Sequence, residues 1–154
     1  MILSPTAPDR RGAPTAPHDA PPPVNEALLD TLVLIIEDEA MIAWTLESLF
    51  DDMGFTSIAL APHAEAAIAA ARAAPPGLIV SDINLGAGLD GVDAVAAIAQ
   101  GAPVPTVFVT GYAGDETRAR ITATVPNAAV LRKPVHPEEL QHAVIEALKA
   151  LTAH

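Results

Sequence analysis

Residues 77–91 read Gly77-Leu78-Ile79-Val80-Ser81-Asp82-Ile83-Asn84-Leu85-Gly86-Ala87-Gly88-Leu89-Asp90-Gly91. The first five of these residues form a short apolar run, which is typical of a strand buried on both faces. The run ends at Asp82 and gives way to a loop rich in glycine and aspartate. Parallel α/β sheets place their sites at the carboxyl ends of their strands. Asp82 is therefore the first candidate for a functional residue.

Three other predicted strands also end in polar residues. Glu37-Asp38-Glu39 follows an apolar run at 32–36, Thr110 follows a run at 105–109, and Lys133 follows a run at 128–131. The carboxyl ends of neighbouring parallel strands open onto one crevice, so we expect these carboxylates to crowd into one pocket. Mutual repulsion makes that arrangement costly unless a cation is bound. The pattern predicts a metal site beside a reactive aspartate.

From residue 27 onward, predicted strands alternate with predicted helices. The strands lie near 32–36, 56–60, 78–81, 105–109 and 128–131, and the helices near 39–53, 63–74, 91–100, 115–122 and 137–151. This alternation indicates a parallel sheet covered by helices on both faces. The predicted fold class is α/β, a flavodoxin-like, doubly wound, five-stranded parallel sheet, (βα)5, in the order 2-1-3-4-5. Two helices carry apolar stripes, Ile42, Leu46, Leu49, Phe50 and Met53 in the first and Leu140, Val144, Leu148 and Leu151 in the last.

The composition narrows the class of protein. The chain has 154 residues, enough for one domain, and it is 51% hydrophobic but only 3% aromatic. Its net charge of −11 argues against binding to nucleic-acid phosphates. The absence of cysteine excludes disulfides and thiolate metal sites. No segment has the length of a membrane span or the pattern of a signal peptide, so we expect a cytoplasmic protein.

Residues 1–27 are expected to form a disordered tail rich in proline and alanine, ahead of one domain over 28–154. Seven prolines fall within residues 1–23, and that segment has almost no large apolar side chain after Leu3. Such a segment cannot offset its ordering entropy by burial. The tail is interpreted as a spacer or an overlong assigned start, and the alternative is a docking tail.

Residues 31–150 resemble the receiver domain of the two-component response regulators. The resemblance rests on the acidic pair Glu37-Asp38, on Asp82, on Thr110 and on Lys133 followed by Pro134, all in the family's order and at similar spacing. It implies that Asp82 accepts a phosphoryl group from a histidine kinase. Thr110 would then donate its hydroxyl to one phosphoryl oxygen, and Lys133 would pair with another.

The resemblance also implies a Mg²⁺ cofactor, a hard cation that prefers oxygen ligands. Asp38 and Asp82 would ligate the ion directly, the main-chain carbonyl of Asn84 would supply a third oxygen, and Glu37 would act through water. The family commonly has two aspartates where this chain has Glu37-Asp38, and we expect the longer side chain to leave metal binding intact. Pro134 is associated in the family with a cis peptide bond, which is uncommon.

One position departs from the family pattern. Most receivers carry a tyrosine or phenylalanine three residues before the lysine, where this chain has Val130. The segment Val107-Phe108-Val109-Thr110-Gly111-Tyr112 instead resembles the Phe-Ala-Thr-Gly-Tyr subgroup of receivers, which is largely single-domain. Tyr112 is therefore a candidate for the mobile switch residue, and the alternative is an ordinary loop tyrosine.

The resemblance also suggests a surface for the histidine kinase. Met41 and Trp44 lie on the first helix but off its apolar stripe. By resemblance, the start of this helix and the loop containing Pro134 and Val135 face the kinase during transfer. The alternative for Trp44 is a role in the fold alone.

The predicted function is that of a stand-alone receiver, a phosphoprotein that signals through protein–protein contacts and is not an enzyme beyond slow autodephosphorylation. We expect no output domain after the last helix. A phosphate sink or shuttle in a phosphorelay is the alternative within the same class, with a phosphotransfer or effector protein as a further partner. The rivals from other classes are an aspartyl-phosphate phosphohydrolase and an interaction module that needs no phosphate. The hydrolases typically place two aspartates one residue apart after the first strand, which Glu37-Asp38-Glu39 does not supply.

Overall fold

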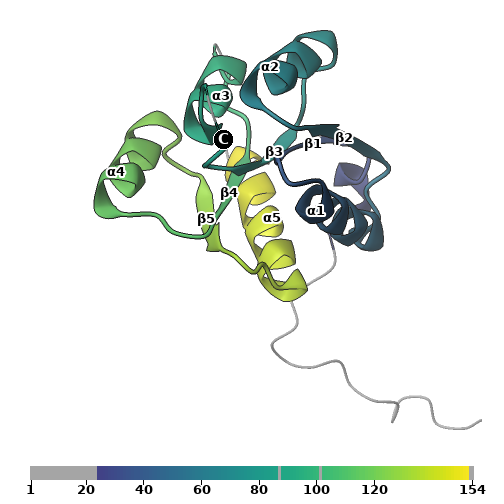
Figure 1. The fold of residues 1–154 in the computed structure, drawn as a ribbon. Coiled ribbons are helices and arrows are strands. Elements are labelled where there is room, and N and C mark those ends of the chain that lie inside the picture. Colours follow the sequence, from purple (N-terminus) through teal and green to yellow (C-terminus); the bar gives the residue numbers. More distant parts are fainter. Residues whose placement is uncertain (1–23, 87, 101, 153–154) are drawn as a thin grey trace, which may run out of the picture.

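The computed structural model describes residues 24–86, 88–100 and 102–152, and it has five strands alternating with five α-helices (Figure 1). The strands are β1 (Leu32–Ile36), β2 (Ser57–Ala61), β3 (Leu78–Asp82), β4 (Thr106–Thr110) and β5 (Ala129–Arg132). The helices are α1 (Ala40–Met53), α2 (Ala64–Ala73), α3 (Gly91–Ile98), α4 (Asp115–Thr124) and α5 (Pro137–Thr152). None of the helices in these ranges is long and apolar enough to cross a membrane.

All strand pairs are parallel, and the strand order is β2-β1-β3-β4-β5. The predicted flavodoxin-like fold class and strand order are therefore confirmed. In the sheet's register, Ile36 lies beside Ser81, and Thr110 lies beside Arg132. The carboxyl ends of β1, β3, β4 and β5 consequently meet at one edge.

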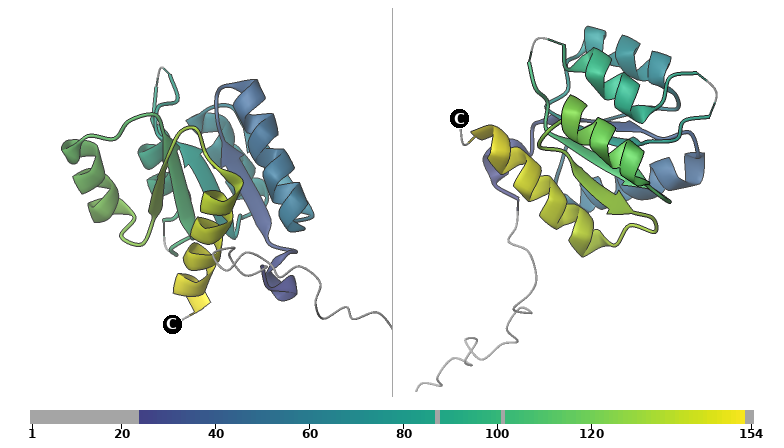
Figure 2. Two further views of the ribbon diagram at one scale, coloured as in Figure 1. Left: turned by 90° about the horizontal axis from the view of Figure 1, so that it is seen from below. Right: turned by 90° about the vertical axis from the view of Figure 1, so that its left-hand side faces the viewer.

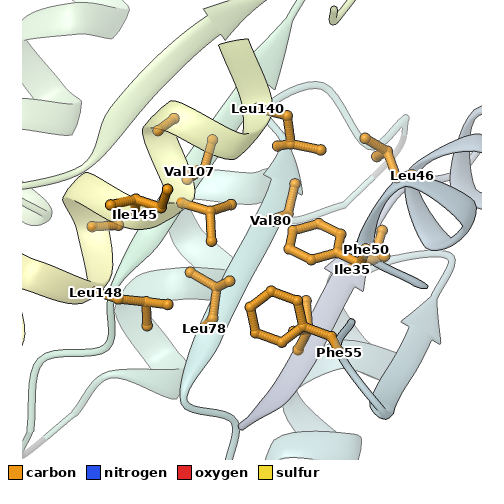
Figure 3. Packing of buried hydrophobic residues seen from close by; sticks show 14 of the residues in the cluster. Ile35, Leu46, Phe50, Phe55, Leu78, Val80, Val107, Leu140, Ile145 and Leu148 are labelled. Atoms are coloured by element: carbon orange, nitrogen blue, oxygen red, sulfur yellow. The ribbon is translucent and has the colours of Figure 1, made fainter. Parts of the chain in front are cut away.

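Two apolar layers cover the sheet, one on each face. One layer packs α1 and α5 against the sheet, and the other packs α2, α3 and α4 against the opposite face (Figure 2). Figure 3 shows the first layer, in which Leu46 and Phe50 from α1 and Leu140 from α5 lie against strand residues such as Val80. β3 is buried along its whole length, as its continuous apolar run predicts.

The apolar stripes predicted for α1 and α5 face the core. Leu46 and Phe50 are buried, and Ile42, Leu49 and Met53 pack against the same layer. The Phe50 ring meets Phe55 edge to face at 5.4 Å between centroids. In α5, Leu140, Val144 and Leu148 are buried, while the side chain of Leu151 lies outside the described part.

α4 differs from the other helices because it has almost no apolar face. Ile121 is its only buried residue. Burying one such side chain contributes roughly 1.5–3 kcal/mol. Gly114 precedes the helix and provides no side-chain cap. Packing therefore holds α4 less firmly than it holds α1 or α5.

The ordered domain begins earlier than the predicted boundary at residue 28. Val24 is only 8% exposed and belongs to the layer beneath α1 and α5. The Asn25 side chain accepts a hydrogen bond from the Ala27 N–H at 2.9 Å and caps the short 3₁₀ helix Glu26–Leu28. Assigning residues 24–27 to the tail is therefore wrong, because the apolar Val24 and this local cap are sufficient to order them. The tail prediction for residues 1–23 falls outside the described residues.

Candidate functional site

Four polar side chains predicted as site residues come together at the carboxyl edge of the sheet. Glu37 follows β1, Asp82 ends β3, Thr110 ends β4, and Lys133 follows β5. Main-chain hydrogen bonds fix two of these strand ends, from Glu37 N–H to the Ala61 carbonyl (3.0 Å) and from Lys133 N–H to the Thr110 carbonyl (2.8 Å). Glu37, Asp82 and Thr110 are 3%, 6% and 2% exposed, so buried polar groups cluster here in an otherwise apolar core.

Lys133 joins the two buried carboxylates. Its Nζ lies 3.2 Å from Asp82 Oδ2, to which it donates a hydrogen bond, and 3.2 Å from Glu37 Oε2. Burial alone would lower the pKa of Lys133, but the hydrogen bond to Asp82 and the charges of Asp82 and Glu37 outweigh it and raise that pKa. Lys133 is therefore a firmly held cation. The Lys133–Pro134 peptide bond is cis, as predicted.

Glu37 is the electrostatically costly member of the cluster. Burial raises the pKa of its carboxyl, the charge of Asp82 raises it further, and the Glu39 N–H and Lys133 offset only part of this. The Glu39 N–H donates to Oε1 at 3.2 Å. Oε2 is buried and accepts no hydrogen bond from the described residues, because its contact with Lys133 has the geometry of an ion pair only. A buried carboxylate oxygen that accepts no hydrogen bond and has one ammonium beside it can still accept a further cation or a water bound to one.

Asp38 and Glu39 extend the acidic cluster into solvent. One carboxylate oxygen of each of Glu37, Asp38 and Glu39 lies within 4.8 Å of the others, and the latter two residues are exposed. Asp38 faces the loop after β3, since its Oδ2 lies 3.9 Å from the position that a Cβ on Gly86 would take. Carboxylates of this kind are the ligands that Mg²⁺ prefers, so the donor set fits the predicted ion.

The Asp82 side chain is held from two sides. Its Oδ1 accepts a hydrogen bond from the Asn84 N–H at 3.2 Å, and its Oδ2 faces Lys133. Both distances are at the long end of the range for hydrogen bonds. The Ser81 hydroxyl donates to the Asp82 main-chain carbonyl at 2.8 Å. The carboxylate is thus oriented by one main-chain N–H and by the Lys133 ammonium.

The Thr110 hydroxyl is bonded to the loop that follows it and not to Asp82. Thr110 Oγ1 donates to the Tyr112 carbonyl at 2.9 Å and accepts from the Tyr112 N–H at 3.3 Å. The Tyr112 side chain is 74% exposed. A hydroxyl that turns from Tyr112 toward Asp82 would release this loop.

The residues predicted for the switch and the kinase surface lie around the same edge. Met41 and Trp44 are 77% and 61% exposed on α1, Pro134 is exposed, and Val135 is half-buried against the core. Val130 packs into the layer beneath α2, α3 and α4. Because valine has no aromatic ring, no ring movement at position 130 can act as the switch.

Sequence reasoning missed several polar residues around the site. It assigned no role to Glu39, to Ser81 or to the ion pair between Arg120 and Asp90. Glu39 could have been found from the run of three acidic residues to which it belongs. Asp90 could have been found as an aspartate directly before a predicted helix, where N-cap residues occur. Arg120 gave no signal, because its partner lies 30 positions away and only the fold brings the two together.

Comparison with known proteins agrees with this geometry. Residues 33–145 match the family model of the response regulator receiver domain. The phyllosphere-induced regulator PhyR of Methylorubrum extorquens is 37% identical over 120 residues, which cover 77% of this chain and 43% of that protein. The chain spans less than half the length of the curated relatives it matches.

Solved structures give the same result. The receiver domain of Erythrobacter litoralis PhyR is 31% identical, with a TM-score of 0.67 over 80% of this chain and 93% of that one. The anti-anti-sigma factor PhyR of Bartonella quintana is 28% identical, with a TM-score of 0.68 over 80% of this chain and 49% of that one. The chain belongs to the response regulator receiver domain family.

Proposed function

We propose that this protein accepts a phosphoryl group from a histidine kinase on Asp82 and signals through protein–protein contacts. One observation carries the proposal, namely that Lys133 bridges Asp82 and the buried Glu37 at 3.2 Å from each. A structural ion pair needs one carboxylate for one ammonium. The second buried carboxylate raises the electrostatic cost, and such a cost is typical of functional sites.

The chemistry requires little movement of the chain. An Asp82 carboxylate oxygen attacks the phosphorus of a phosphohistidine, an O–P bond forms, and the N–P bond breaks. The electron pair returns to the imidazole nitrogen, which takes up a proton, and Asp82 becomes an acyl phosphate. Lys133 is already positioned to pair with a phosphoryl oxygen. Its raised pKa keeps it charged at neutral pH.

Glu37, Asp38 and Asp82, with the main-chain carbonyl of Asn84, would hold Mg²⁺ at this site. The buried Oε2 of Glu37, which lies beside the Lys133 ammonium but accepts no hydrogen bond, supports this assignment. When bound, the ion neutralises charge on the phosphoryl oxygens. Glu37 accepts the Glu39 N–H through Oε1, and its Oε2, which lies beside Lys133, would reach the ion through a water.

The surface around the pocket supports docking of a protein donor. The exposed large hydrophobic residues of the described chain all lie on or beside the connections that follow β1 to β4, namely Met41, Trp44, Leu60, Leu89 and Tyr112. Exposed apolar side chains that surround a polar site are typical of protein interfaces. We assign Met41, Trp44, Pro134 and Val135 to the kinase surface and Tyr112 to the output surface.

Transfer from candidate histidine kinases tests the proposal. A kinase carrying a radiolabelled phosphohistidine should pass its label to the wild-type protein when Mg²⁺ is present. Asp82→Asn has nearly the same shape but lacks the carboxylate nucleophile, so it should accept none. Rapid loss of label to a third protein would indicate a shuttle or sink. Label on Asp82→Asn would overturn the assignment.

Phosphorylation should reorder the loop after β4. The Thr110 hydroxyl would leave the Tyr112 carbonyl for a phosphoryl oxygen, so residues 110–116 and α4 would lose one tether. Amide exchange with and without beryllofluoride, a phosphoryl mimic, should change most across residues 110–120. Tyr112→Ala should keep Asp82 labelling and weaken partner binding. Exchange differences concentrated in α1 would contradict this assignment.

A further inference from the structure

Gly91, the first residue of α3, lies directly against the main chain of Asp82. A Cβ at this position would stand 1.9 Å from the Asp82 carbonyl oxygen and 2.7 Å from Ser81 Oγ. The Gly91 N–H also donates to the Ile83 carbonyl at 2.8 Å. The position of α3's first residue and the position of the Asp82 main chain therefore depend on each other.

Asp90 fixes the start of α3 next to this contact. Its Oδ1 accepts the Asp93 N–H at 2.9 Å, and Asp93 Oδ2 accepts the Asp90 N–H at 3.3 Å, which forms a reciprocal capping box. Because Asp90 precedes Gly91 directly, a displacement of Asp90 reaches the Asp82 carbonyl through one peptide unit.

Arg120 on α4 holds Asp90 from outside. Its Nη2 lies 2.6 Å from Asp90 Oδ1, 2.7 Å from Asp90 Oδ2 and 3.3 Å from Asp93 Oδ1. Burial would raise the pKa of Asp90, but the hydrogen bonds from Arg120 and from the Asp93 N–H outweigh it and keep the pKa below its ordinary value. The pair is therefore charged at neutral pH.

The same ion pair is a main anchor of α4. The helix buries only Ile121. Among the described residues, a second side chain of α4 that bonds to a preceding segment is Arg118, whose Nε donates to the Ala113 carbonyl at 3.3 Å. The loop before the helix is tied to the Thr110 hydroxyl. The segment from Tyr112 to α4 is thus joined to the site at two points, Thr110 and Asp90.

We propose that Arg120 is a positioning residue for phosphoryl transfer, which acts through Asp90 and Gly91 on the main chain of Asp82. This inference rests on the proposed function. It adds a connection between α4 and the reacting aspartate that is separate from the Thr110 hydroxyl. Because coupling free energies are reciprocal, a change at Asp82 that moves Gly91 also changes the stability of the Arg120–Asp90 ion pair.

The test compares labelling rates of folded variants at saturating acetyl phosphate and saturating Mg²⁺. Arg120→Gln should slow labelling on the order of tenfold, because small displacements of a reacting group are costly. Arg120→Lys should keep most of the wild-type rate, since a single guanidinium nitrogen makes all three contacts with Asp90 and Asp93. Arg72→Gln, which removes the charge of an exposed residue in α2, should have no effect.

Two further readouts separate positioning from a general loss of structure. Mg²⁺ affinity should fall far less in Arg120→Gln than the labelling rate does, because two of the proposed ligands, Glu37 and Asp38, follow β1 and do not lie on the Asp82 main chain that Arg120 positions. In Asp90→Asn, which keeps a good N-cap, labelling should already be slow, and adding Arg120→Gln should slow it no further. Asp90→Asn alone also serves as the test should Arg120→Gln not fold.

The outcomes distinguish this inference from the proposed function. If wild-type protein is not labelled, the proposed function fails. If wild type is labelled and Arg120→Gln is labelled at the same rate, only the role of Arg120 fails. A slowing by Arg120→Gln that is equally large in the Asp90→Asn background would also overturn it, because Arg120 would then act by another route.

Discussion

Mg²⁺-dependent labelling of the protein by a small phosphodonor should disappear in Asp38→Ala. Asp38 is exposed, and its side chain makes no hydrogen bond with the described residues, so the substitution should leave the fold intact. It removes a direct ligand from a cation that prefers carboxylate oxygens. Losing a residue that only orients a ligand costs about 10–100-fold in metal affinity, so we expect a larger loss here. The measurement is labelling rate against Mg²⁺ concentration.

Asp52→Ala is the matched control for this experiment. It removes an exposed aspartate of α1 at the helix end opposite Asp38. Mg²⁺ should raise the melting temperature of wild type and of Asp52→Ala, because a ligand that binds only the folded state stabilises it. Mg²⁺ should not raise the melting temperature of Asp38→Ala. Equal Mg²⁺ dependence in all three proteins would exclude Asp38 as a ligand.

Lys133→Met should strongly destabilise the metal-free protein at neutral pH. The substitution leaves the fully buried side chain of Glu37 and that of Asp82 without their shared counterion. Breaking a buried ion pair by removing one partner costs about 3–5 kcal/mol. The free energy of unfolding from urea titrations, with chelator present, measures this loss. Lys149→Met, a change at a lysine whose side chain is 66% exposed, is the control and should cost little.

The pH dependence of Lys133→Met has a definite sign. Glu37 already has a raised pKa in the folded wild type, and removing Lys133 removes a charge that lowers it. Protonation of Glu37 relieves the repulsion, so the difference from wild type should shrink as the pH falls through the pKa of folded Glu37. Added Mg²⁺ should also shrink it. A stability loss independent of both pH and Mg²⁺ would show that Lys133 contributes only packing.

The sequence was sufficient for the fold because its signals are local. The continuous apolar run of β3 and the stripe of α1 each report burial directly, and the structure bears out both. The boundary of the tail was predicted wrongly at residues 24–27 because the burial of Val24 depends on contacts that are not local. One valine in a segment rich in proline does not show that it will be buried, because its partners in α1 and α5 are far away in the chain.

The site was predictable only where residues end strands. Glu37, Asp82, Thr110 and Lys133 each follow an apolar run, so a parallel sheet brings them to one edge. Their distances, the ion pair between Glu37 and Lys133, and the hydrogen bond from Thr110 to Tyr112 depend on side-chain orientations that no local pattern encodes. The Arg120–Asp90 pair depends on how α4 lies against α3, which is a property of packing alone.

The most direct test of the account is the intact mass of the protein after treatment with acetyl phosphate and Mg²⁺. We expect one added phosphoryl group in wild type, which mild base should remove because it hydrolyses acyl phosphates, and none in Asp82→Asn or in the presence of chelator. An added phosphoryl group that persists in Asp82→Asn, or that forms at the same rate without Mg²⁺, would contradict it.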